Sequence, residues 1–311
     1  MIPTPRSMLA QIFLSPSERR LRAGWRLVLQ SLLLLVILSI ISIGVAILTL
    51  FLGIDLNALP PLSLVNLLPT VLSMTLAVWT ARRLLDRRSL VSLGFSVGPR
   101  TLPDLAVGFL IPGVMMGAIY LLELGLGWVR FDGWAWQSVP AGQVVLGLFS
   151  GLLGFAVVGY QEELLSRGYH LQNIRDGMGL GWGLLVSSGI FALMHLGNPN
   201  VTWYTTLPGL LVAGYFLAYG WVRTRQLWLS IGLHVGWNFF EGTVFGFPVS
   251  GIDLVGLIRQ TPTGPVAFTG GRFGPEAGLI LAPAMAVGVA LVWRYTRGRL
   301  IPPQESPYCS G

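Results

Sequence analysis

The chain has 311 residues, of which 53% are hydrophobic and only 11% are charged, and its formal net charge is +7. A composition this apolar excludes an ordinary soluble domain and predicts a polytopic membrane protein. All 20 basic residues are arginines in short clusters between apolar runs, a pattern that does not indicate nucleic-acid binding. The single cysteine, Cys309, excludes an internal disulfide and a cysteine-based metal cluster, and we assign it no role.

Eight apolar runs have the length and composition expected of transmembrane helices. The first follows a cluster of arginines, exceeds the length of a signal-peptide core and has no small-residue cleavage site behind it, so we expect a signal anchor. The sequence therefore predicts an all-α, polytopic membrane helix bundle of about eight transmembrane helices with both termini cytoplasmic. The runs lie near residues 26–52, 62–81, 104–126, 143–168, 180–197, 205–222, 227–247 and 277–293.

The distribution of arginines agrees with this topology. With the N-terminus inside, the cytoplasmic segments hold 17 arginines and the outer segments hold three, Arg130, Arg259 and Arg272. Such an excess on the cytoplasmic side is the usual orientation signal of membrane proteins. An odd number of spans would remove the asymmetry.

The predicted helices and loops divide the chain into five segments and give no sign of a second domain. The outer loop is rich in Gly, Pro and Thr and includes the stretch Thr269-Gly-Gly-Arg-Phe-Gly-Pro-Glu276, and we expect it to be a flexible reconnecting loop. The segments are a cytoplasmic N-terminal segment (1–25), the first three helices with their loops (26–143), helices four to seven (144–247), the outer loop (248–276), and the last helix with a cytoplasmic tail (277–311).

Two adjacent carboxylates, Glu162 and Glu163, lie inside the fourth apolar run. An ionised side chain in hydrocarbon costs roughly 3 kcal/mol, so it indicates a function by default. Residues four apart on a helix face each other, so we expect Glu163 to pair with Arg167 and Glu162 to remain free for chemistry. The alternative is that both glutamates belong to one structural ion-pair network.

Two of the three histidines also fall in predicted spans. His234 and Asn238 are four residues apart and project from one helix face. Counted from the predicted turn at Asp176-Gly177, Glu162 and His195 lie roughly 21 and 27 Å along antiparallel helices, which is a similar depth. His234 is expected to lie shallower unless its helix begins deeper in the bundle. Two histidines, an asparagine and a glutamate pair at compatible depths favour a functional site over isolated structural histidines.

Three motifs combine these residues, each on its own predicted span. They stand as Glu162-Glu163-Leu-Leu-Ser-Arg167, Phe191-Ala-Leu-Met-His195 and His234-Val-Gly-Trp-Asn238. In type and order they resemble the motifs of the CAAX prenyl endopeptidases and bacteriocin-processing enzymes, the CPBP or Abi family of intramembrane proteases. The resemblance covers residues 144–247, and the first 140 residues carry no diagnostic motif.

The resemblance implies hydrolysis of a peptide bond within the membrane. Glu162 would then act as general base for a water that His195 helps to hold, and His234 and Asn238 would donate hydrogen bonds to the oxyanion. Glu163 counts among the implied catalytic residues, and Arg167 and Phe191 support them. The family is often described as metalloproteases. A zinc site would use Glu162, His195 and His234, although the usual His-Glu-x-x-His helix is absent.

The implied substrate is a peptide or membrane protein that is in some cases lipidated, among membrane lipids and without nucleic acid. We expect a multi-pass protein of a prokaryotic cell membrane. A membrane-embedded binding or immunity protein is the main alternative, and a proton-coupled transporter is a weaker one because the chain's halves do not repeat the motifs. Glu123 and Glu241 are further acidic residues in the spans. Glu241→Gln would abolish the activity of a proton relay through His234 and leave proteolysis largely intact.

Overall fold

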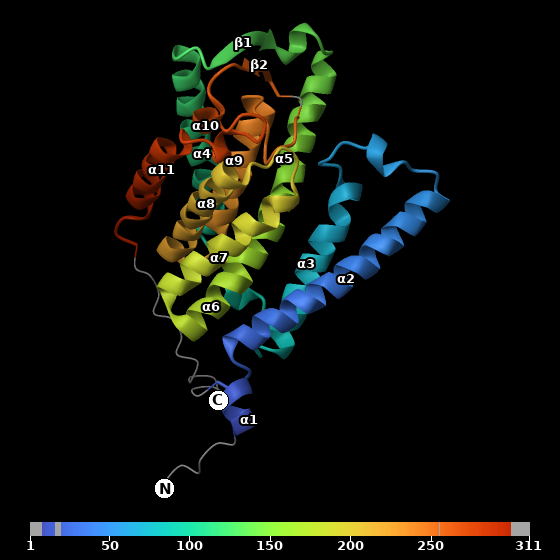
Figure 1. Cartoon of the computed structure of the whole chain (residues 1–311), viewed down its shortest axis with the longest axis vertical. Helices are drawn as coiled ribbons and strands as arrows, with labels where there is room; N and C mark the ends of the chain where they lie inside the picture. The colour runs from blue at the N-terminus through green and yellow to red at the C-terminus, as the bar shows by residue number, and fades with distance from the viewer. Residues whose placement is uncertain (1–7, 16–19, 255, 300–311) are drawn as a thin grey trace.

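The computed structural model describes residues 8–15, 20–254 and 256–299, so the expectations for Cys309 and for the two ends of the chain lie outside the described residues. Nearly all of the described secondary structure is helical, with one small antiparallel sheet (Figure 1). The helices are α1 (Met8–Phe13), α2 (Ala23–Phe51), α3 (Leu64–Leu84), α4 (Thr101–Gly125), α5 (Ala141–Glu163), α6 (Leu171–Met178), α7 (Leu180–Met194), α8 (Trp203–Thr224), α9 (Trp228–Asn238), α10 (Val266–Thr269) and α11 (Leu281–Thr296). The strands are β1 (Val129–Trp134) and β2 (Ile258–Pro262).

Six of the described helices are long and apolar enough to cross a membrane, and α9 and α11 are shorter helices in the places of the seventh and eighth predicted spans. The predicted class, a polytopic bundle of membrane helices, is confirmed. The longest span, Ala141–Met178, joins α5 and α6 through a π-helical segment, Leu164–His170. Its 38 residues rise by about 57 Å, well beyond the roughly 30 Å hydrocarbon core. The following turn lies at Gly179, slightly later than predicted, with a positive φ that suits glycine.

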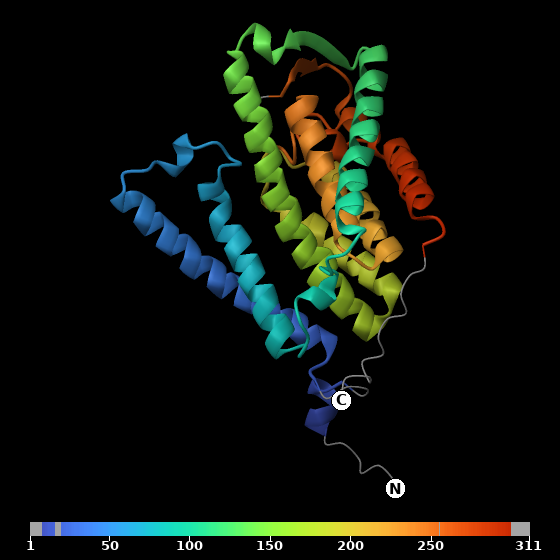
Figure 2. The same ribbon diagram turned by 180° about the vertical axis from the view of Figure 1, so that it is seen from behind.

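The first two spans form a hairpin that diverges from the other helices toward its loop end (Figures 1 and 2). The α2 helix exposes large apolar side chains along most of its length, including Leu35, Ile40 and Ile47. Because such a surface is stable only in an apolar solvent, α2 lies against lipid. Ser63 caps the start of α3 by accepting a hydrogen bond from the backbone N–H of Asn66 at 3.3 Å.

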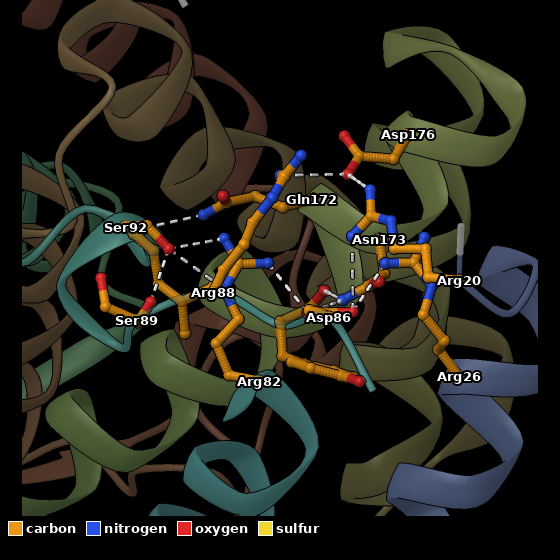
Figure 3. Close-up of polar contacts among 12 residues, drawn as sticks. Arg20, Arg26, Arg82, Asp86, Arg88, Ser89, Ser92, Gln172, Asn173 and Asp176 are labelled. Atoms are coloured by element: carbon orange, nitrogen blue, oxygen red, sulfur yellow. Dashed lines mark hydrogen bonds and ion pairs between the residues drawn. The ribbon is translucent and has the colours of Figure 1, made fainter. Parts of the chain in front are cut away.

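An arginine–aspartate cluster fixes this hairpin to α6 at the other end (Figure 3). Its centre is Asp86, just after α3, whose buried carboxylate lies 2.6 Å from the Arg26 guanidinium and 2.8 Å from that of Arg82. The Asn173 amide of α6 also donates to Asp86, at 3.4 Å. Arg20 lies 3.7 Å from Asp86 and 3.1 Å from Asp176. The cluster therefore links the beginning of α2, the end of α3 and α6.

The α9 helix lies at the centre of the main bundle, with every residue from Leu229 to Asn238 buried. Its contact with α4 is a backbone contact: a Cβ on Gly236 would lie 2.2 Å from the Phe109 carbonyl oxygen, and one on Gly232 would lie 2.5 Å from that of Leu105. Only glycine permits helices to approach this closely. The close packing fixes α9, which carries the two polar residues of the third motif, His234 and Asn238.

The outer loop is not the flexible reconnecting segment that its composition suggested. It contains β2, which pairs with β1, and a stretch that folds back against α8, where Phe273 and Glu276 are buried. Glycines make this packing possible. A Cβ atom on Gly251 would clash with the Pro199 carbonyl oxygen, and a Cβ atom on Gly274 would clash with the Pro248 carbonyl oxygen. The loop glycines therefore serve close packing as well as turns.

Candidate active site

The three motifs meet in one place. Glu162 lies in the last turn of α5, His195 directly follows α7, and His234 lies in the middle of α9. The Glu162 Oε2 atom lies 3.8 Å from the Nε2 atom of His195 and 3.8 Å from the Nε2 atom of His234. Glu162 and His195 share a level, as the residue count predicts, and His234 reaches the same level instead of a shallower one.

Glu163 is fully buried and binds two partners. Its Oε1 atom accepts a 2.7 Å hydrogen bond from the Arg167 guanidinium, the predicted i,i+4 pair. The same oxygen lies 2.9 Å from the Nδ1 atom of His234. Glu163 therefore holds the α9 histidine in place, while the neighbouring Glu162 faces the cavity with 17% of its side chain exposed.

Phe191 packs among these groups. Its ring centroid lies 4.4 Å from the Arg167 guanidinium carbon and 4.7 Å from the His195 ring. Arg167 also donates to the Gly214 carbonyl oxygen of α8 at 2.9 Å. A cation over an aromatic face gains about 2 kcal/mol when both are desolvated, so Phe191 helps to accommodate the buried guanidinium and supports His195 from one side.

The hydrogen bonds of both histidines define their orientation. The Nδ1 atom of His195 lies 2.8 Å from the Phe191 carbonyl oxygen, and that of His234 faces the Glu163 carboxylate. Both partners are acceptors, so Nδ1 carries the proton in each ring. The two Nε2 atoms are left facing Glu162. At 3.8 Å the separations exceed a direct hydrogen bond and leave space for a small molecule that bonds to all three groups.

The polar cluster opens into a cavity of about 370 Å³, a size within the range of ligand sites. Asn238 lines this cavity, and its side-chain amide has no hydrogen-bond partner among the described residues. The walls come from the start of α3, from α5, α7, α8 and α9, and from the outer loop. The apolar lining residues include Leu62, Leu67, Phe155, Val158, Leu210, Phe216 and Trp237.

The outer loop adds residues that sequence reasoning did not assign to the site. Glu276 and Ser250 both line the cavity. The Glu276 Oε1 atom accepts hydrogen bonds from the backbone N–H of Ser250 at 2.8 Å and from its hydroxyl at 2.7 Å. Asn198, after α7, donates to the Ser250 carbonyl oxygen at 3.2 Å. The Gly-Pro-Glu stretch was the only hint in the sequence that this loop contributes to the site. Its local sequence does not indicate that the loop folds back against α8.

The two other glutamates of the predicted spans, Glu123 and Glu241, are fully buried, and neither is among the residues that line this cavity. Glu241 lies in a second π-helical segment, Phe239–Val244, that follows α9. The wider π-turn changes the angular spacing, so Glu241 does not share the cavity face of His234 as α-helical counting suggests. Its carboxylate instead lies close to Gly274 of the outer loop.

The donor set named for zinc does not fit a metal site as it stands. Within the described part of the chain, no group of three or more His, Cys, Asp or Glu side chains is arranged to hold a metal ion. Ligands about 2.1 Å from a tetrahedral zinc lie roughly 3.4 Å apart, whereas the Glu162 carboxylate lies 3.8 Å from each histidine nitrogen. We therefore derive no reaction step through zinc.

The fold and the site together define a multi-pass membrane protein with a buried glutamate–histidine–asparagine centre beside an internal cavity. Residues 143–240, about a third of the chain, match the family model described as Rce1-like, type II CAAX prenyl endopeptidase Rce1-like. The matched segment contains all three motifs, and the resemblance found from them is confirmed. A search of curated proteins gave no match.

Proposed function

We propose that this protein is an intramembrane endopeptidase in which Glu162 activates a water molecule for attack on a peptide bond. The observation that carries the proposal is the convergence of the two histidine Nε2 atoms on the Glu162 carboxylate at the edge of a cavity. The Rce1-like match over the same residues supports a CAAX-type endopeptidase. The cavity size agrees with entry of a peptide segment.

The reaction begins with a water that hydrogen-bonds to Glu162 and His195. Glu162 takes one proton from this water while the water oxygen bonds to the carbonyl carbon of the substrate. Negative charge then develops on the carbonyl oxygen. The Asn238 amide and a protonated His234 donate hydrogen bonds to that oxygen, and fixed donors of this kind are effective in a site that excludes bulk water. Glu162 returns its proton to the nitrogen as the C–N bond breaks.

Glu163 and Arg167 prepare His234 for this role. A protonated His234 brings the cluster of Glu162, Glu163, Arg167 and His234 to zero net charge. The Nδ1–H group of His234 donates its hydrogen bond to Glu163, so the Nε2–H group is the one that can donate to the substrate. The buried Glu163 carboxylate thus favours the protonated ring and fixes its direction.

The substrate is a peptide or a segment of a membrane protein, and a lipid-modified chain end fits the apolar lining. The start of α3 and the middle of α5 form one wall of the cavity, with Leu62, Leu67 and Val158 exposed to it. An acyl or prenyl chain passing between these helices would remain in an apolar environment. The expected setting is a prokaryotic cell membrane with both termini cytoplasmic.

Cleavage of membrane-presented peptides by the purified protein tests the proposal. Glu162→Gln keeps the size of the side chain but removes the base, so we expect peptide cleavage to fall by about 10²–10⁴-fold with an unchanged melting temperature. His195→Ala is expected to reduce cleavage as well. Asp55→Asn, in the distant loop before α3, is the matched control and should retain full activity.

Two outcomes would redirect the interpretation. Cleavage that persists in Glu162→Gln would show that another group activates the water. Specific, saturable binding of a membrane partner without cleavage, equal in wild type and Glu162→Gln, would favour the binding or immunity function. A chelator series tests the zinc hypothesis separately, because activity lost to the chelator and restored by zinc would place a metal in the mechanism.

A further inference from the structure

The outer loop places a third carboxylate in the candidate active site. Glu276 lines the same cavity as Glu162, His195 and His234, yet it comes from the segment that precedes α11. Its side chain is 4% exposed. A carboxylate so deeply buried is costly unless hydrogen bonds or a cationic partner compensate for the lost water.

Glu276 is held firmly at one of its two oxygens. Both hydrogen bonds from Ser250 reach Oε1, and Oε2 receives no hydrogen bond from any described side chain or backbone group. The backbone of Glu276 packs against α8, where a Cβ on Gly209 would lie 2.0 Å from the Glu276 carbonyl oxygen. The residue is therefore fixed in position with one acceptor oxygen unused.

The unused Oε2 atom is not among the fully buried unpaired polar atoms of the described residues, and Glu276 lines the cavity, so this oxygen is open to a molecule that occupies the cavity. The proposed hydrolysis supplies a partner for the unused oxygen. When the C–N bond breaks, Glu162 returns its proton to the leaving nitrogen, and the new carboxylic acid gives up a second proton to it. The products are a carboxylate and an ammonium group, and the ammonium needs a negative partner.

We propose that Glu276 is a further catalytic residue that binds the leaving nitrogen of the substrate and stabilises the positive charge that develops on it. This inference rests on the proposed peptidase function. Glu162, which lies in the matched segment, acts on the water. Glu276, which lies in the outer loop, acts on the leaving group. Ser250 is the positioning residue that holds Glu276.

A comparison of two substrates tests the assignment. The first is a cleaved peptide, and the second is the same sequence with an ester in place of the scissile amide. An ester releases a neutral alcohol, so it has no need of Glu276. We expect Glu276→Gln to reduce kcat/KM for the peptide at least about tenfold more than for the ester, since only the peptide loses a charge-assisted hydrogen bond to its leaving group.

Two further variants complete the experiment. Ser250→Ala should show the same preference for the ester to a smaller degree, and it provides the measurement if Glu276→Gln does not fold. Asp253 lies exposed in the same loop. The control variant Asp253→Asn should therefore leave the cleavage of both substrates unchanged.

An equal loss on peptide and ester, or no loss on either, would overturn the role of Glu276. Glu162→Gln should lose both activities, because both reactions need the activated water. A wild-type protein that cleaves neither substrate would instead overturn the proposed peptidase function, and the inference with it. The behaviour of the wild type thus separates the two failures.

Discussion

Glu163 is the residue on which the polar centre depends. It is completely buried, and a single oxygen connects Arg167 of its own helix with His234 of α9. Its second oxygen, Oε2, has no hydrogen-bond partner among the described residues. Both the stability of the site and the direction of the His234 ring therefore depend on the charge balance around this one carboxylate.

Removing Arg167 should destabilise the protein strongly. Arg167→Met removes the guanidinium partner of the Glu163 carboxylate, and loss of one partner of a buried pair costs about 3–5 kcal/mol. Thermal unfolding in detergent should show the loss as a much lower melting temperature. The double variant Glu163→Gln/Arg167→Met should recover part of it. If Arg167→Met melts with the wild type, the pair does not stabilise the fold.

Arg130→Met is the matched control for this measurement. The Arg130 side chain pairs with Asp132 at 2.8 Å but is 68% exposed. Solvent screens such a surface pair, so we expect no measurable change in melting temperature.

Local geometry explains which site contacts were predictable. The pair of Glu163 and Arg167 follows from helical spacing, and the meeting of Glu162 with His195 follows from counting residues on either side of one turn. The bond between Glu163 and His234 joins residues 71 positions apart, and the position of Glu276 depends on loop packing against α8. Neither contact leaves a periodic signal in the sequence.

At the scale of elements, the position of α9 is determined by its glycines. They bring the α9 backbone against α4. One π-helical segment begins directly after Glu163 and contains Arg167, and a second begins directly after Asn238. π-helical turns often occur near functional sites. The length of the apolar runs predicts the helices themselves, but it contains no indication of a π-turn or of which helix pairs with which.

A methyl group at Gly236 should displace α9. The added Cβ of Gly236→Ala would lie 2.2 Å from the Phe109 carbonyl oxygen, and overpacking of this kind costs about 1–3 kcal/mol. We expect a lower melting temperature and reduced peptide cleavage. Gly189→Ala on α7 has no atom within 4 Å of its added Cβ and should keep both. Full activity in Gly236→Ala would show that α9 can shift without harm.

At the scale of the whole molecule, the arginine–aspartate cluster of Figure 3 joins one end of the α2–α3 hairpin to α6, and α3 also packs against α5. The apolar spans were predictable from composition, and the class of the protein followed from them. The cluster was not predictable, because Asp86 gathers partners from 60 residues before it and 87 residues after it.

Neutralising Asp86 should loosen the hairpin. Asp86→Asn leaves the guanidinium groups of Arg26 and Arg82 without their shared carboxylate, which we expect to destabilise the hairpin by about 3 kcal/mol. Hydrogen exchange should become faster in α2 and α3 and stay unchanged in α9. Asp55→Asn, near the other end of the hairpin, should leave all three helices as they are. Unchanged exchange in Asp86→Asn would mean that the packing of α3 against α5 and the lipid contacts hold the hairpin without the cluster.

The pairing of Glu163 with Arg167 inside one helix also bears on how the chain enters the bilayer during synthesis. The fourth span emerges from the ribosome before α9 exists, so His234 is not yet present to balance its charges. An i,i+4 ion pair forms within the span itself. Membrane insertion of this helix therefore transfers one uncompensated carboxylate, that of Glu162, instead of three separate charges, which lowers the barrier to its integration.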